Sequence, residues 1–236
     1  MELDIVMAEL EAKGNEQTKK VLKNHGAKEP FFGVKVQDLK VILKGRKNNQ
    51  ELAEQLYATG NTDAMYLAGL MADKNSISKE TIERWADEAY WYYLNEYAVP
   101  WIAAESPYGL ELATKWIEDP RPQIQATGWA TFSSILGIQT EHELSDKQVI
   151  LLMERVEREI HEQSPRVRFV MNGFVIAAGA SSESLTEIAK TFGKRIGKVE
   201  VPMPNNIRCN VPDIPTYIKK VEDRGSIGRK KKTARC

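Results

Sequence analysis

A succession of short amphipathic segments, several opened by a helix-capping signal, most limits the folds open to this chain. Before residue 193, nearly every segment places apolar residues at helical spacing over roughly 11 to 18 positions, and the links are short and polar. Ser145 and Gln148 form a capping-box pattern, and Ser184 and Glu187 repeat it. No strand pattern interrupts this series. We therefore expect an all-α fold over this part of the chain.

About a dozen consecutive helices with short loops indicate stacked helical hairpins rather than a compact bundle. The repeat would be about 35 to 45 residues, as in two-helix arrays of the HEAT kind. Besides an aromatic helix around 90–101, the expected helices span 2–12, 16–24, 36–47, 50–59, 62–73, 78–90, 106–119, 123–136, 146–162, 166–178, 184–195 and 215–223. The prediction is a curved α-solenoid of HEAT-like hairpins, forming one domain over residues 1–224.

The pattern changes at Lys198. From there, β-branched residues alternate with polar ones on both sides of Pro204-Asn205-Asn206, which is turn chemistry. We predict a β-hairpin within 198–212, with strands at 199–203 and 207–211. Its prolines suit exposed edges, so the hairpin should project from the solenoid. Residues 225–236 are expected to form a basic flexible tail.

The formal net charge of zero hides a division of charge along the chain. Residues 193–236 contain twelve basic and four acidic residues, a net charge of +8, which leaves −8 on the first 192 residues. Such asymmetry predicts a polyanionic partner, most commonly nucleic acid, although a basic tail can also serve solubility alone. The candidate DNA-binding residues are Lys194, Arg195, Lys198, Asn205, Asn206, Arg208, Arg166 and Arg168.

Residues 85–101 hold seven aromatic side chains, more than a third of those in the chain. At helical spacing, one face carries Tyr90, Leu94, Tyr97 and Trp101, and a second carries Glu88, Tyr92 and Glu96. The first face is expected to be core. Pro100 should kink or end the helix near Glu96, because proline cannot donate to the carbonyl four residues back. A kink here suits a binding site, and it equally suits an ordinary tight junction between helices.

Composition excludes several other classes of protein. No run of 18 apolar residues indicates a membrane span, and the two cysteines fit a reducing compartment rather than a disulfide framework. The three histidines match no metal-ligand spacing, and no glycine-rich nucleotide loop is present. We expect a cytoplasmic protein with no metal and no cofactor. A monomer is expected, although the sequence does not determine the oligomeric state.

Two local motifs connect the chain to a known family. Phe32-Gly33 is followed by Lys35-Val36-Gln37-Asp38-Leu39-Lys40, and the aromatic helix ends in Ala98-Val99-Pro100. With the helical array, these features make most of residues 1–192 resemble the HEAT-like repeat DNA alkylation repair proteins, whose prototype is the AlkD-like glycosylases. The resemblance implies a curved array that cradles duplex DNA on its concave face.

The resemblance also suggests site residues. Alignment on Val99-Pro100 places a tryptophan pair of the family at Trp91 and Tyr92 and its catalytic aspartate at Glu96. A further family tryptophan falls on Phe174, and a family arginine falls near Ala126, so that arginine is missing. The longer carboxylate and the missing arginine resemble an AlkF/AlkG-like sub-branch that lacks base excision and binds branched DNA.

Three hypotheses follow. The favoured one is a non-enzymatic DNA-binding protein that recognises branched DNA or junctions by shape. The second is a glycosylase that excises alkylated bases, with Glu96 stabilising the oxocarbenium-like transition state and Trp91, Tyr92 and Phe174 as ring contacts. The third is a HEAT scaffold that binds proteins.

Overall fold

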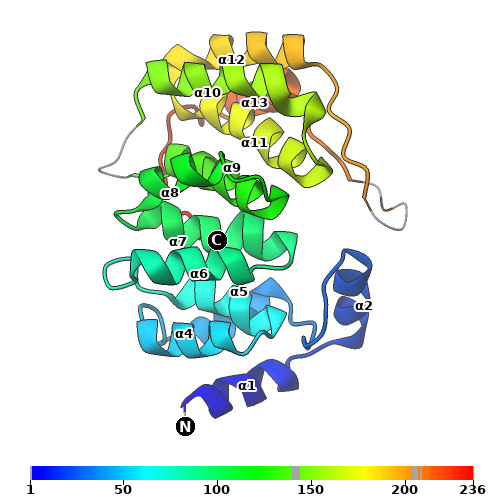
Figure 1. Ribbon diagram of the computed structural model, residues 1–236, viewed down its shortest axis with the longest axis vertical. Coiled ribbons are helices and arrows are strands. Elements are labelled where there is room, and N and C mark those ends of the chain that lie inside the picture. Colours follow the sequence, from blue (N-terminus) through cyan, green and yellow to red (C-terminus); the bar gives the residue numbers. More distant parts are fainter. Residues whose placement is uncertain (1, 140–143, 204–206, 208, 236) are drawn as a thin grey trace.

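The chain folds as a stack of helices that follow one another in sequence order (Figure 1). The computed structural model describes residues 2–139, 144–203, 207 and 209–235. The helices are α1 (Glu2–Ala12), α2 (Glu16–Asn24), α3 (Val36–Leu43), α4 (Gln50–Ala58), α5 (Thr62–Met71), α6 (Lys79–Glu88), α7 (Val99–Glu105), α8 (Gly109–Trp116), α9 (Pro122–Gly137), α10 (Asp146–Glu159), α11 (Pro165–Ser181), α12 (Glu183–Ile196) and α13 (Ile214–Asp223). The predicted all-α fold is confirmed.

Local capping explains where some of these helices begin. The Ser145 and Gln148 capping box is present at the start of α10, as predicted. The second box is wrong: α12 begins at Glu183, and the Ser184 hydroxyl donates instead to the carboxylate of Asp146, at 2.6 Å. A side chain from another helix thus outcompetes the local cap.

The two larger hydrophobic clusters of the interior meet at α8 and α9. The first runs from α1 to the start of α9, and the second runs from α8 to α13. Helix α9 packs against α8 and α7 on one side and α11 on the other. Gly128 permits the α8–α9 approach, because a Cβ there would lie 2.8 Å from the backbone nitrogen of Ile117. Both clusters therefore belong to one continuous array.

The aromatic stretch is not one continuous helix. Helix α6 ends at Glu88, and Leu94–Ala98 forms a π-helical turn that leads directly into α7. Within this turn the Val99 amide donates to the carbonyl of Leu94, five residues back. Near Glu96, where the sequence predicted a kink or an end, the helix departs from regular α-helical geometry, because Pro100 has no amide to donate. The predicted helical register starting at Tyr90 is wrong, since Tyr90 precedes the helical residues.

The predicted β-hairpin is also wrong for the residues that the structure describes. Residues 197–213, which we call the arm, contain no strand where they are described. Side chains of α11 take the place of a ladder: Arg168 donates to the carbonyl of Glu200 at 3.3 Å, and Asn172 donates to that of Pro212 at 3.0 Å. The buried Val199 and Val201 anchor the arm in the second cluster. Prolines on both sides also lack the amide that a ladder requires.

Residues 225–235, which the sequence predicts as part of a basic flexible tail, run back along the array. Residues 225–235 pass from α13 to the middle of the stack, where Figure 1 places the C-terminus near α7. Lys231 exchanges backbone hydrogen bonds with Gly137 and Gln139 at the end of α9, at 2.9 and 2.8 Å. The guanidinium of Arg235 pairs with the carboxylate of Glu105 and donates to the carbonyl of Ala72, at 2.6 Å. Helix carboxyl ends carry free carbonyls and partial negative charge, so basic residues find partners there that composition cannot reveal.

Among the helices of the described residues, none is both long enough and apolar enough to cross a membrane.

Candidate functional site

A cavity of about 390 Å³ opens where the aromatic stretch, α9, α11 and the arm approach one another. We call it the site cavity. It is lined by His25, Gly26, Tyr90, Trp91, Tyr92, Asn95, Glu96, Pro122, Gln123, Ala126, Ser164, Pro165, Arg166, Pro202 and Met203. These residues come from segments far apart in the chain, so only the tertiary fold assembles them. Of the sequence-predicted residues, Trp91, Tyr92, Glu96 and Arg166 are brought together here.

Glu96 and Arg166 form a buried ion pair at this cavity. The Arg166 Nε donates to Glu96 Oε1 at 2.7 Å, and Nη2 donates to Oε2. The Glu96 side chain is 2% exposed and that of Arg166 is 22% exposed. A bidentate guanidinium–carboxylate pair of this kind has strict geometry and strong hydrogen bonds. The carboxylate is therefore already occupied by a cation of the chain itself.

Aromatic rings enclose the same guanidinium. Its central carbon lies 4.2 Å from the ring centroid of Tyr92 and 4.4 Å from that of Phe169. Its remaining nitrogen, Nη1, faces the sulfur atoms of Met203 and Cys209, each at 3.8 Å. Both sulfurs belong to the arm. Arg166 thus connects the π-helical turn, α11 and the arm in one contact.

Burial controls the protonation of Glu96. Removal from water raises the pKa of this carboxyl to about 7, although the hydrogen bonds and the charge of Arg166 act in the opposite direction. Its environment therefore differs from that of an exposed glutamate.

Trp91 and Tyr92 are held by the segment after α2. The indole Nε1 of Trp91 donates to the carbonyl of His25 at 2.9 Å, and its buried ring stacks on Tyr93 with centroids 4.2 Å apart. The hydroxyl of Tyr92 lies 3.0 Å from Nδ1 of His25. The polar groups of both rings are thus used within the protein, which gives the cavity a fixed aromatic wall.

Asn95 was not anticipated from the sequence. It lies in the π-helical turn, lines the site cavity and is 5% exposed. Its Oδ1 atom is buried and has no hydrogen-bond partner among the described residues. No sequence signal could identify it, because a regular helix would present a different face.

Phe174, predicted as a ring contact, is instead a core residue. It is fully buried, with its ring 5.2 Å from that of Trp129 and 6.2 Å from that of Phe132. Phe169, one and a half helical turns earlier on α11, supplies the ring beside Arg166. The alignment position with the missing arginine, Ala126, does line the cavity. The nearby positive charge comes from α11 instead of α9.

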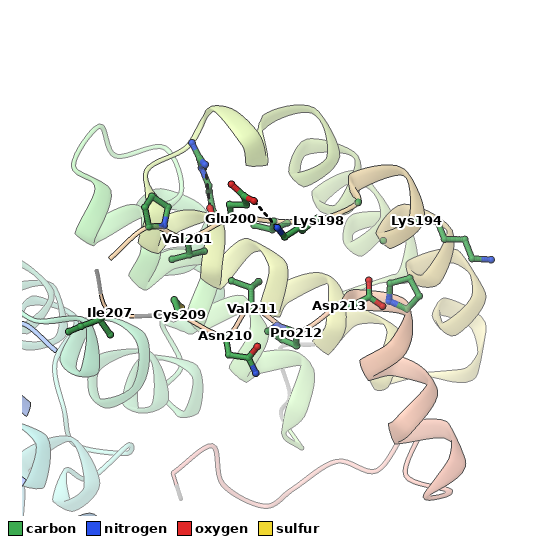
Figure 2. Close-up of a pocket in the computed structure, with 16 residues that line it drawn as sticks. Lys194, Lys198, Glu200, Val201, Ile207, Cys209, Asn210, Val211, Pro212 and Asp213 are labelled. Atoms are coloured by element: carbon green, nitrogen blue, oxygen red, sulfur yellow. Dashed lines mark hydrogen bonds and ion pairs between the residues drawn. The ribbon is translucent and has the colours of Figure 1, made fainter. Parts of the chain in front are cut away.

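The other predicted DNA-binding residues cluster only in part. A groove of about 720 Å³ lies between the arm and α12, and Arg168, Lys194 and Lys198 line it. Figure 2 shows Lys198 paired with Glu200, at 2.8 Å, and the side chain of Lys194 extending away from the groove. Arg195 pairs with Glu157, with Nη2 and Oε2 2.9 Å apart, outside this groove. Asn205, Asn206 and Arg208 lie outside the described residues.

No group of three or more histidine, cysteine, aspartate or glutamate side chains in the described part of the chain is placed to hold a metal ion.

Comparisons with known proteins agree with this architecture. A family model described as "DNA alkylation repair enzyme" matches residues 6–190. The chain is 33% identical over 227 residues to uncharacterized protein Lin0241 of Listeria innocua serovar 6a, covering 94% of this chain and 97% of that protein. Uncharacterized protein Lmo0209 of Listeria monocytogenes serovar 1/2a matches with the same identity and coverage. A solved structure, described as "A new family of proteins related to the HEAT-like repeat DNA glycosylases with affinity for branched DNA structures", aligns over 100% of both chains with a TM-score of 0.91 and 39% identity.

Proposed function

We propose that this chain, which belongs to the DNA alkylation repair enzyme family, binds branched DNA by its shape and does not excise bases. Its membership of the family and its HEAT-like fold agree with the resemblance inferred from the sequence. The finer assignment rests on the site.

The ion pair between Glu96 and Arg166 carries the proposal. A glycosylase acting on cationic bases needs an available carboxylate and open ring faces, because positive charge develops on the sugar as the bond breaks. Here the Arg166 guanidinium occupies that position, bonded to the carboxylate and placed against the ring of Tyr92. A ligand cation would have to displace a buried, bidentate partner. The site is therefore suited to holding the arm in place rather than to stabilising a transition state.

The arm and its groove support binding to branched DNA. Lys194 and Lys198 are exposed there, and Arg195, with its side chain 50% exposed, lies on the same helix end. These cations can contact phosphates where strands diverge. Arg208, Asn205 and Asn206 would contact a groove or the junction opening. The structural neighbour with 39% identity is described as having affinity for branched DNA structures.

A titration against two DNA substrates tests this function. We expect the wild-type protein to bind a four-way junction more tightly than a linear duplex of matched length, and both affinities should fall steeply with salt as counterions are released. A gel-shift assay at several salt concentrations measures both. Equal affinity for the two substrates would contradict shape recognition. Absence of binding even at low salt would favour the protein-binding scaffold.

Base release provides the second test. We expect wild-type protein to release no alkylated base from methylated duplex DNA above the protein-free background, because Glu96 is neutralised within the protein. Chromatography of the soluble fraction after incubation measures free base. Release that disappears in a Glu96→Gln variant would instead establish the glycosylase mechanism.

A further inference from the structure

A second basic region lies near the amino terminus, although the net charge of the first 192 residues as a whole is negative. Residues 13–47 contain ten basic residues and three acidic ones, so their net charge is 10 − 3 = +7. Some of these charges are used internally, since Arg46 pairs with Glu9 and Lys19 lies 3.2 Å from Glu29. Lys20 and Lys23 are exposed, and neither side chain forms an ion pair or hydrogen bond with a described residue. They lie three positions apart on α2 and so share one face of that helix.

Helix α2 is exposed, yet it is firmly positioned. None of its residues is buried, and it stands beside the main stack in Figure 1. Its ends are nevertheless fixed: the Asn15 amide donates to Phe32 at 3.2 Å, and the His25 carbonyl accepts from Trp91 at 2.9 Å. Gly33 makes the close approach possible, because it adopts φ +80 and a Cβ there would lie 2.6 Å from the backbone nitrogen of Lys19. Apart from Leu22, which packs against the small cluster of Ala27, Phe31 and Trp91, a helix held in this way leaves its surface available for binding.

Helix α2 lies close to the same cavity as the arm. His25 and Gly26, directly after α2, and Pro202 and Met203 of the arm line the same site cavity. Figure 1 shows α2 and the arm on the same edge of the molecule. Helix α2 and the arm therefore flank one opening, with the exposed Lys20 and Lys23 on α2 and the exposed Lys198 on the arm.

We propose that Lys20 and Lys23 of α2 form a second phosphate-binding surface. This surface contacts one duplex branch of a branched DNA, while the protein arm contacts another branch. The inference rests on the proposed function. Two separated contact surfaces on the protein favour a branched substrate. The diverging DNA duplexes of a junction can contact both surfaces at once, whereas a single straight duplex need contact only one. Lys20 and Lys23 would contact phosphates, so they contribute affinity without reading the base sequence.

The test is the double variant Lys20→Glu, Lys23→Glu. Its matched control is Lys74→Glu, Lys147→Glu, which changes the net charge equally at two exposed positions. Lys74 follows the carboxyl end of α5, and it is the amino end of this helix, at Thr62, that contacts Lys28. Lys147 lies at the start of α10, and it is His161, just after the far end of this helix, that contacts Ile196. Both control positions are therefore remote from the opening beside α2.

We expect the α2 variant to bind a four-way junction about tenfold more weakly than wild type. Its slope of log affinity against log salt should be smaller in magnitude by about 2, which corresponds to two lost phosphate contacts. The control should retain most of the wild-type affinity and slope, and unchanged thermal melting would show that both variants fold. If the α2 variant behaves like the control while wild type prefers the junction, this inference is wrong and the proposed function stands. If wild type shows no preference for the junction, both fail.

Discussion

Replacing Arg166 with alanine is expected to lower the free energy of unfolding by about 3–5 kcal/mol, because Glu96 then stays buried without its cation. Water cannot replace the guanidinium easily, since the carboxylate side chain is only 2% exposed. The variant also loses the packing of the guanidinium against Tyr92 and Phe169. Urea denaturation of wild type and variant at pH 8 measures the difference.

The same variant should show a distinct pH dependence. The pKa of Glu96 is raised to about 7 in the folded protein, above its reference value of 4.5, so between these values the native state binds more protons than the unfolded state. Stability therefore decreases as pH rises through this range and levels off above it. Without Arg166 the pKa should rise further. The stability of Arg166→Ala should thus keep falling above pH 7, where that of wild type is level.

Two further variants distinguish loss of the ion pair from nonspecific destabilisation of the fold. Arg195→Ala removes an exposed partner of Glu157 and should have a much smaller effect, because exposed pairs are screened by water. Glu96→Gln combined with Arg166→Met removes both charges and should recover much of the lost stability. An Arg166→Ala variant no less stable than Arg195→Ala would show that the pair does not hold the arm.

Shortening the arm is expected to produce the largest change in DNA binding. Replacing residues 204–208 with two glycines removes Asn205, Asn206 and Arg208 but keeps Met203 and Cys209, which contact Arg166. Loss of these contacts should reduce affinity for a four-way junction by about 1–3 kcal/mol, which is roughly 5-fold to 150-fold. Gel-shift titration at fixed salt measures this loss.

Affinity for linear duplex is the internal control for this variant. It should fall less than affinity for the junction, because the exposed Lys194 and Lys198 remain to contact phosphates. Equal losses on both substrates would show that residues 204–208 add charge but no recognition of branching. Junction binding at the wild-type level would assign recognition to surfaces outside these residues.

The sequence predicted most of the helices because their signals are local. Apolar spacing and caps gave the exact limits of α1 and α2, and for α9, α10 and α13 they came within a few residues. Pro100 correctly marked the departure from regular α-helical geometry near Glu96, since the missing amide is a property of that residue alone. For the arm, local signals gave the wrong prediction. The alternation around Val199 and Val201 matches a strand, but two backbone carbonyls of the arm accept hydrogen bonds from Arg168 and Asn172 on α11.

The candidate site shows the same division between local and distant information. The sequence predicted an aromatic helix that kinks or ends near Glu96, and it drew attention to Trp91, Tyr92 and Glu96. Only the tertiary structure decided what Glu96 does, because its partner Arg166 is 70 positions away and no local pattern links them. It likewise moved Phe174 into the core and attached Arg235 to Glu105, 130 positions away. Helical hydrogen bonds join near neighbours in the chain, whereas buried charges must be paired with whatever the packed array brings within reach.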